Sequence, residues 1–166
     1  MREKLNNVEN LTENSEVAQN IWRYVVNSIK RVGREDILEN PIVLDLGGGM
    51  GEFSKNLNKQ GINCVSLDIQ DLEPNPGVNQ VIARAQKMPF ASESFNIVHE
   101  RGVFDKKLYP NDVLSLLLEI VRVLKPKGIL SIYDADHPEK EDLEKHFNIL
   151  NPGKEYPTLW EKKLEE

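Results

Sequence analysis

Apolar residues recur at helical spacing in several stretches of the chain. Residues 14–32 place them every three or four positions, which predicts an amphipathic helix that ends at Gly33. Similar stripes predict helices over residues 52–60 and 112–124. A short acidic helix is expected at residues 138–145.

Shorter apolar runs between these helices predict β-strands. They cover residues 42–46, 63–68, 78–83, 95–99 and 129–133. Two more runs, 147–150 and 158–160, flank the turn signal Asn151-Pro152-Gly153 and predict a closing antiparallel pair. Because strands alternate with helices, we expect an α/β fold. We expect its sheet to be mostly parallel and seven-stranded, with an antiparallel C-terminal strand and with helices on both faces.

The connection between the second and third predicted strands is unusually short. Only residues 69–77 separate them, and two of these nine residues are proline. A parallel crossover normally needs a dozen or more residues and a helix. We therefore expect the helix after the second strand to be missing. This would leave one sheet face thin, to be covered by the N-terminal helix or by a partner subunit, including a second copy of the chain.

Length and composition predict one domain, residues 1–166. A formal net charge of -6 argues against nucleic acid as a partner, because phosphate binding depends on clustered Lys and Arg. No stretch has the apolar length of a signal peptide or a membrane span. The single cysteine, Cys64, lies within an apolar run, as is typical of a reduced compartment. We expect a cytoplasmic protein with no membrane partner.

Four glycines, Gly47, Gly48, Gly49 and Gly51, lie between the first predicted strand and the following helix. In parallel sheets this turn is the usual ligand site, because the absence of Cβ atoms lets a ligand touch the main chain. A purely structural turn would need only one or two glycines. The cluster therefore predicts a nucleotide-type pocket.

The residue after this cluster restricts the ligand. A dinucleotide fingerprint beginning at Gly47 requires glycine or alanine at its sixth position, where this chain has Glu52. A carboxylate there would also repel a diphosphate, and no Gly-Lys-Ser/Thr sequence of a P-loop is present. We expect a ligand that lacks a phosphate chain and can carry positive charge.

The segment Asp-Leu-Gly-Gly-Gly-Met-Gly, residues 45–51, resembles the first motif of class I S-adenosylmethionine-dependent methyltransferases. Residues 67–69, 85–90 and 119–128 resemble further motifs of that family in the same order. The likeness covers roughly residues 40–134 and is nearest to the ubiquinone and menaquinone biosynthesis type, methyltransferase domain type 11. It implies a Rossmann-like three-layer sandwich with an N-terminal helical segment, 1–40, and a cofactor-binding core, 41–134.

The resemblance implies S-adenosyl-L-methionine as the cofactor and gives roles to particular residues. The main chain of Gly47, Gly48, Gly49 and Gly51 would lie against the methionyl part, with Asp45 near its ammonium group. Asp68 would accept hydrogen bonds from both ribose hydroxyls. Ile69 would cover one adenine face, and the Ala85 main chain and the Gln86 side chain would meet the adenine edge.

One position departs from the family pattern. Arg84 stands where the family usually has an aspartate that accepts a hydrogen bond from the adenine amino group. Arginine cannot accept a hydrogen bond. Either Gln86 or a main-chain carbonyl replaces that contact, or adenine binding is weakened; otherwise Arg84 is a solvated charge at a strand end.

Methyl transfer from a sulfonium needs no covalent nucleophile, and a base only where the acceptor must lose a proton. The candidate residues follow the fourth and fifth predicted strands: His99, Glu100, Arg101, Tyr133, Asp134 and Asp136. Glu100 is the first choice, as a general base or as a main-chain contact to the cofactor. We expect no metal site, because the three histidines have no short ligand spacing.

The sequence therefore predicts an S-adenosylmethionine-dependent methyltransferase that acts on a small-molecule acceptor. The acceptor itself cannot be identified from the residues. The alternative is a cofactor-binding module or regulatory subunit without transfer activity of its own.

Overall fold

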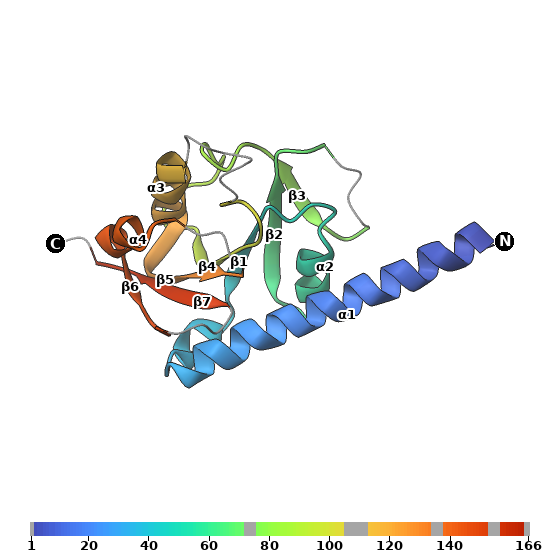
Figure 1. Cartoon of the computed structure of the whole chain (residues 1–166), viewed down its shortest axis with the longest axis horizontal. Helices are drawn as coiled ribbons and strands as arrows, with labels where there is room; N and C mark the ends of the chain where they lie inside the picture. Colours follow the sequence, from blue (N-terminus) through green and yellow to red (C-terminus); the bar gives the residue numbers. More distant parts are fainter. Residues whose placement is uncertain (1, 72–75, 105–112, 134–137, 153–156, 165–166) are drawn as a thin grey trace.

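In the described part of the chain, seven strands form one sheet (Figure 1). The computed structural model describes residues 2–71, 76–104, 113–133, 138–152 and 157–164, with side chains from residue 16 onward. The strands are β1 (Ile42–Leu46), β2 (Asn63–Asp68), β3 (Asn79–Ile82), β4 (Phe95–Glu100), β5 (Leu124–Ile132), β6 (Phe147–Ile149) and β7 (Thr158–Lys162). Their order across the sheet is β3-β2-β1-β4-β5-β7-β6.

The sheet is parallel except at its C-terminal side. The pairs β1/β2, β2/β3, β1/β4 and β4/β5 are parallel, whereas β7 runs antiparallel to both β5 and β6. The predicted α/β fold with an antiparallel C-terminal strand is confirmed. The strand order reverses between β1 and β4, so the carboxyl ends of these two strands border the crevice where ligands of such sheets bind.

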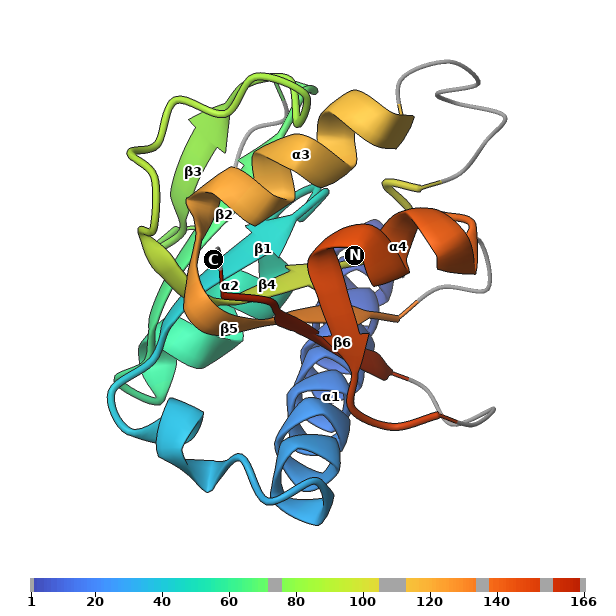
Figure 2. The ribbon, with the colours of Figure 1, turned by 90° about the vertical axis from the view of Figure 1, so that its left-hand side faces the viewer.

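Helices cover both faces of the sheet (Figure 2). One face carries α1 (Arg2–Arg31) and α2 (Glu52–Lys59), whose apolar residues form a core with Val43, Cys64 and Ile97. The opposite face carries α3 (Val113–Val123) and α4 (Lys140–His146) over a second core. A short 3-10 helix, Glu35–Leu38, links α1 to β1. None of the described helices combines the length and apolar character that a membrane crossing requires.

Two element boundaries differ by more than two residues from the sequence-based predictions. Helix α1 begins at Arg2 rather than near residue 14, because only Leu5, Val8 and Leu11 interrupt the polar residues of its first half, a sparser apolar pattern than that of residues 17–32. Strand β5 begins at Leu124, directly after α3, rather than at Ile129. Its first residues include Pro126, which is tolerated because β7 pairs with β5 only from Ile129 onward.

No helix follows β2 in the described residues 69–71 and 76–78, as predicted. The start of β3 instead packs on the glycine-rich turn after β1. Gln80 donates a hydrogen bond to the carbonyl of Gly49 at 3.0 Å. Farther along β3, the side chain of Ile82 is 53% exposed. Coverage of this edge by a partner subunit remains a prediction.

Candidate functional site

The turn from β1 into α2 is built on left-handed main-chain conformations. Gly47, Gly49 and Gly51 have φ angles of 76°, 55° and 79°, which residues with a Cβ rarely adopt. The N–H of Gly47 donates to the carbonyl of Leu67 at 2.8 Å, so the turn is tied to the end of β2. The glycine loop, residues 47–51, is thereby held at the carboxyl ends of two adjacent strands.

At three of these four glycines, neighbouring atoms of the protein leave no room for a side chain. A Cβ on Gly47 would lie 2.3 Å from the side chain of Val103, and one on Gly51 would lie 2.5 Å from Val78. A Cβ on Gly48 would lie 2.1 Å from the hydroxyl of Ser66. Such contacts are far inside van der Waals distance. Only Gly49 has nothing within 4 Å of its Cβ position, so it alone of the four faces open space.

Asp68 ends β2 with its carboxylate already oriented by the main chain. Its Oδ2 accepts a hydrogen bond from the N–H of Gly49 at 2.9 Å, and its Oδ1 accepts one from the N–H of Gln70 at 2.9 Å. Each carboxylate oxygen has a second lone pair, so two acceptor positions remain. Asp68 lines a cavity together with Ile69, Ala85 and Gly47. An adjacent pair of hydroxyls matches these acceptors.

Asp45 lies beneath the glycine loop and is only 3% exposed. The main-chain N–H of Ser54, the third residue of α2, favours the charged form of the Asp45 carboxylate. Burial raises the pKa of Asp45 to about 7. Its Oδ2 and the hydroxyl of Ser66 are both buried without a hydrogen-bond partner in the described structure. Asp45 lines neither of the cavities at the glycine loop.

A second cavity adjoins the first on the other side of the glycine loop. It lies between α1, the start of α2 and the end of β4, and it is lined by Val17, Met50, Glu52 and Phe53 among others. Gly47 and Arg101 line both cavities. The two cavities are therefore neighbours over the carboxyl ends of β1, β2 and β4, and together they are called the cleft.

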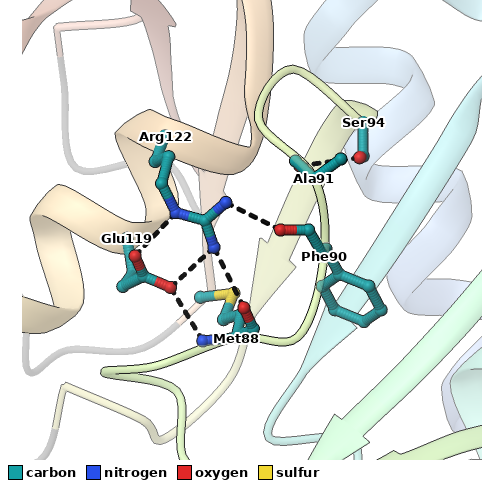
Figure 3. A network of polar contacts seen from close by, with 6 residues as sticks. All are labelled: Met88, Phe90, Ala91, Ser94, Glu119 and Arg122. Carbon is teal, nitrogen blue, oxygen red and sulfur yellow. Dashed lines mark hydrogen bonds and ion pairs between the residues drawn. The ribbon is translucent and has the colours of Figure 1, made fainter.

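The segment between β3 and β4 has no helix of its own and is held by α3 (Figure 3). Arg122 donates to the carbonyls of Phe90 at 2.7 Å and Met88 at 3.0 Å. Glu119 accepts a hydrogen bond from the N–H of Met88 at 2.7 Å and pairs with Arg122. The Arg122 hydrogen bond holds the pKa of Glu119 below its usual range. This clamp fixes the main chain just after Ala85.

The predicted adenine-edge residues lie on this clamped segment. Ala85 lines the first cavity, whereas Gln86 does not, and the Gln86 amide nitrogen is buried without a hydrogen-bond partner in the described structure. Arg84 is exposed and lies outside both cavities. This exposed position fits the alternative that Arg84 is a solvated charge at a strand end.

The two residues that end β4 face opposite layers. Glu100 is buried on the α3 side, and its Oε2 accepts a hydrogen bond from the N–H of Val103 at 3.2 Å. His99 stacks on Phe53 with ring centroids 4.6 Å apart, and its Nδ1 lies 3.2 Å from the hydroxyl of Ser131. Burial, assisted by the Arg101 charge, lowers the pKa of His99 to about 3. The imidazole is therefore neutral at physiological pH.

The remaining strand-end candidates are only partly described. Tyr133 is half-buried, with its ring centroid 6.1 Å from that of His99, while Asp134 and Asp136 lie outside the described residues. Among the described side chains, no three of His, Cys, Asp or Glu are grouped as metal ligands.

The sequence names some of the residues that shape the cleft but not others. Arg101 is among the predicted strand-end candidates, and of those that the structure describes it alone lines both cavities. Val103 and the Glu119–Arg122 clamp were not predicted. The clamp had a weak signal, since Glu119 and Arg122 are three residues apart on one helix, but their main-chain partners are about thirty residues away.

A comparison with known protein families identifies a family that matches this chain. A family model described as a methyltransferase domain matches residues 44–132, more than half of the chain. The match begins in β1, includes the glycine loop, Asp68 and the α3 clamp, and ends in β5.

Curated relatives agree with this match. The chain is 32% identical over 134 residues to a ubiquinone/menaquinone biosynthesis C-methyltransferase of Blochmanniella pennsylvanica, covering 71% of this chain and 51% of that protein. It is 28% identical over 130 residues to a sterol 4-C-methyltransferase of Caenorhabditis elegans, covering 70% of this chain and 38% of that protein. The chain thus spans about half or less of the length of these relatives.

A solved structure shares the fold at low sequence identity. It is the 1,6-didemethyltoxoflavin-N1-methyltransferase of Burkholderia thailandensis, with bound 1,6-didemethyltoxoflavin and S-adenosylhomocysteine. The TM-score is 0.59 at 16% identity, with 94% of this chain and 87% of that chain covered. The similarity supports the three-layer arrangement of the sheet and its helices.

Proposed function

Because the chain belongs to the methyltransferase domain family, we propose that it binds S-adenosyl-L-methionine and transfers the methyl group to a small-molecule acceptor. One observation carries the proposal: the Asp68 carboxylate, held by two main-chain N–H groups, lines a cleft that continues over the glycine loop. An anchored acceptor of this kind suits a ribose.

The residues of the cleft fit the parts of this cofactor. The free lone pairs of Asp68 would accept from the ribose hydroxyls. Ile69, which is 42% exposed, would cover an adenine face, and the main chain of Ala85, with Gln86 next to it, would meet the adenine edge. The main chain of Gly47, Gly48 and Gly49 would lie along the methionyl part. A charged phosphate chain is disfavoured by Glu52 in the same cleft.

Catalysis in this proposal comes mainly from orientation. Bound S-adenosyl-L-methionine supplies an activated methyl group on a sulfonium. The chain holds the adenosine end through Asp68 and the clamped Ala85 segment, so that an acceptor meets the methyl group in line.

Glu100 is proposed to position the loop after β4. Its Oε2 holds the N–H of Val103, whose side chain packs against Gly47. Glu100 lines neither cavity of the cleft, so the structure offers no support for its predicted role as a general base. A proton on the acceptor would then pass to water or to the strand-end residues nearest the cleft.

The acceptor class rests on the relatives. One acts in quinone biosynthesis and another, by its name, on a sterol. These names support a small organic acceptor for this chain.

Two experiments test the proposal. The first is titration calorimetry with S-adenosyl-L-methionine and S-adenosylhomocysteine. The second is a transfer assay with a methyl-labelled donor and a panel of quinol, sterol and amine acceptors. We expect both adenosyl ligands to bind and at least one acceptor to be labelled. Binding without transfer to any acceptor would favour the cofactor-binding module. Absence of binding by a folded sample would overturn both.

A further inference from the structure

A cavity of about 610 Å³ lies outside the cleft, between α1 and α2. Figure 1 shows these two helices side by side, and both pack on the same face of the sheet. Five residues between Gln19 and Val26 and three between Asn56 and Gln60 line the cavity, which we call the α1–α2 groove. Small-molecule sites typically measure about 300–1,000 Å³, so the groove has room for a ligand.

Both charged side chains that line the α1–α2 groove are positive. Arg23 comes from α1 and Lys59 from the last turn of α2. Arg23 donates to Oδ1 of Asn20 at 2.9 Å, and in the described part of the chain neither cation forms an ion pair. Lys59 complements the negative end of the α2 dipole, but Arg23 lies before the last turn of α1 and has no such role. In a chain of formal net charge -6, the groove is a local surplus of positive charge.

The other polar groups of the α1–α2 groove are side-chain amides. On the α2 wall, Nε2 of Gln60 donates to Oδ1 of Asn56 at 2.6 Å, and Asn56 is buried, with an exposed fraction of 6%. On the α1 wall, the amides belong to Gln19 and Asn20. Amide N–H groups can donate to anionic oxygens, and no carboxylate lines the groove to repel an anion.

Trp22 lies between the α1–α2 groove and the cleft. Its ring meets Phe53 edge to face, with ring centroids 6.2 Å apart. Trp22 lines the groove, whereas Phe53 lines the second cavity of the cleft. The groove shares no lining residue with either cavity of the cleft. It is therefore a separate place on the molecule from the one proposed for the methyl donor.

We propose that the α1–α2 groove binds a small, multiply charged oxyanion, with Arg23 and Lys59 as the cations of its two walls. A guanidinium can donate two parallel hydrogen bonds to a phosphate or carboxylate group, and an ammonium adds a point charge beside it. Such a ligand bridges α1 and α2 and stabilises their packing. The inference does not rest on the proposed function, since no residue of the cleft takes part.

Titration calorimetry with two probes tests this site at about 0.15 M salt, where long-range attraction between exposed charges is screened. Inorganic pyrophosphate represents phosphate ligands, and citrate represents carboxylate ligands. We expect at least one of them to bind saturably at one site per chain, and the tighter of the two identifies the class of anion. Arg23→Gln and Lys59→Gln should each weaken that binding by at least about tenfold, the scale of one charge-assisted hydrogen bond.

Lys30→Gln is the matched control, because Lys30 is exposed on the same helix as Arg23 but does not line the groove. It removes the same charge and should change the affinity by less than about twofold. An equal loss in Lys30→Gln would mean general attraction to a basic surface and would overturn the inference. Binding of neither probe by the folded protein would also overturn it, and binding of a hexaglutamate peptide alone would assign the groove to an acidic polypeptide instead. The proposed function is tested by adenosyl ligands and stands or fails separately.

Discussion

Arg122 of α3 donates a hydrogen bond to the main-chain carbonyl of Met88 at 3.0 Å, from a helix to a segment thirty-four positions earlier in the chain (Figure 3). With Glu119 on the N–H of the same residue, α3 grips both polar groups of the Met88 main chain. The segment that carries Ala85 therefore has a fixed position although no helix connects β3 to β4.

Replacing Arg122 with methionine should loosen that segment. The change removes the hydrogen bonds to Met88 and Phe90 and leaves Glu119 without its cation, so we expect a loss of about 2 kcal/mol in the free energy of unfolding. Chemical denaturation measures this loss. Lys145→Met, which breaks the exposed pair with Asp142, is the control and should leave the free energy of unfolding nearly unchanged, because solvent screens that pair. Equal losses would show that the clamp contributes no more than a surface pair.

Asp68 should determine the affinity for the ribose. Asp68→Ala removes the acceptors for the hydroxyls and should weaken S-adenosylhomocysteine binding by about 1–3 kcal/mol in titration calorimetry. Asp68→Asn keeps one acceptor oxygen and should lose less. Asp71→Asn changes a nearby exposed carboxylate outside both cavities and serves as the control. Unchanged affinity in Asp68→Ala would remove the ribose assignment.

Asp45 should make stability depend on pH. The unfolded chain releases this proton near pH 3.8, whereas the folded protein keeps it to about pH 7. Between these values the folded state binds more protons, so the free energy of unfolding falls as pH rises and levels off above pH 7. The total fall is up to about 4 kcal/mol, at about 1.4 kcal/mol per pH unit.

Asp45→Asn keeps a polar side chain of nearly the same shape but has no proton to lose. The difference in unfolding free energy between wild type and this variant, measured by urea titration from pH 4 to pH 8, isolates the contribution of Asp45 from that of His99. A difference that is constant across this range would contradict the raised pKa.

Replacing Gly47 should mainly lower stability, whereas replacing Gly49 should mainly lower cofactor affinity. Gly47→Ala adds a Cβ 2.3 Å from Val103 at a φ of 76°, and should cost about 2–4 kcal/mol of stability. Gly49→Ala meets no atom within 4 Å and should cost only about 1 kcal/mol of conformational strain. Because Gly49 lines the cleft, its variant should lose cofactor affinity more than stability. Thermal unfolding and calorimetry of both variants check this, and equal destabilisation would contradict it.

The elements that the apolar pattern predicted most closely are the buried central strands. β1 and β2 have the predicted bounds, Ile42–Leu46 and Asn63–Asp68, because each is a short, mainly buried run that lies between polar or glycine-containing segments. The start of α1 and of β5 could not be located this way. The first half of α1 is mostly polar, with only Leu5, Val8 and Leu11 at helical spacing. The first residues of β5 include Pro126 and Gly128, which are typical of the end of a helix.

By itself the sequence determined the parallel sheet, the glycine loop after β1 and an acidic residue at the end of β2. The spacing of apolar residues and the wide range of φ angles open to glycine are local properties, so the residue types indicate them directly. Only the tertiary structure decided that Asp45 is buried beneath the loop and that Arg101 borders both cavities. It also decided that Val103, Ser66 and Val78 occupy the space that side chains at Gly47, Gly48 and Gly51 would need. These relationships join residues from different strands and helices. Their distances are set by how the layers pack, which no spacing along the chain encodes.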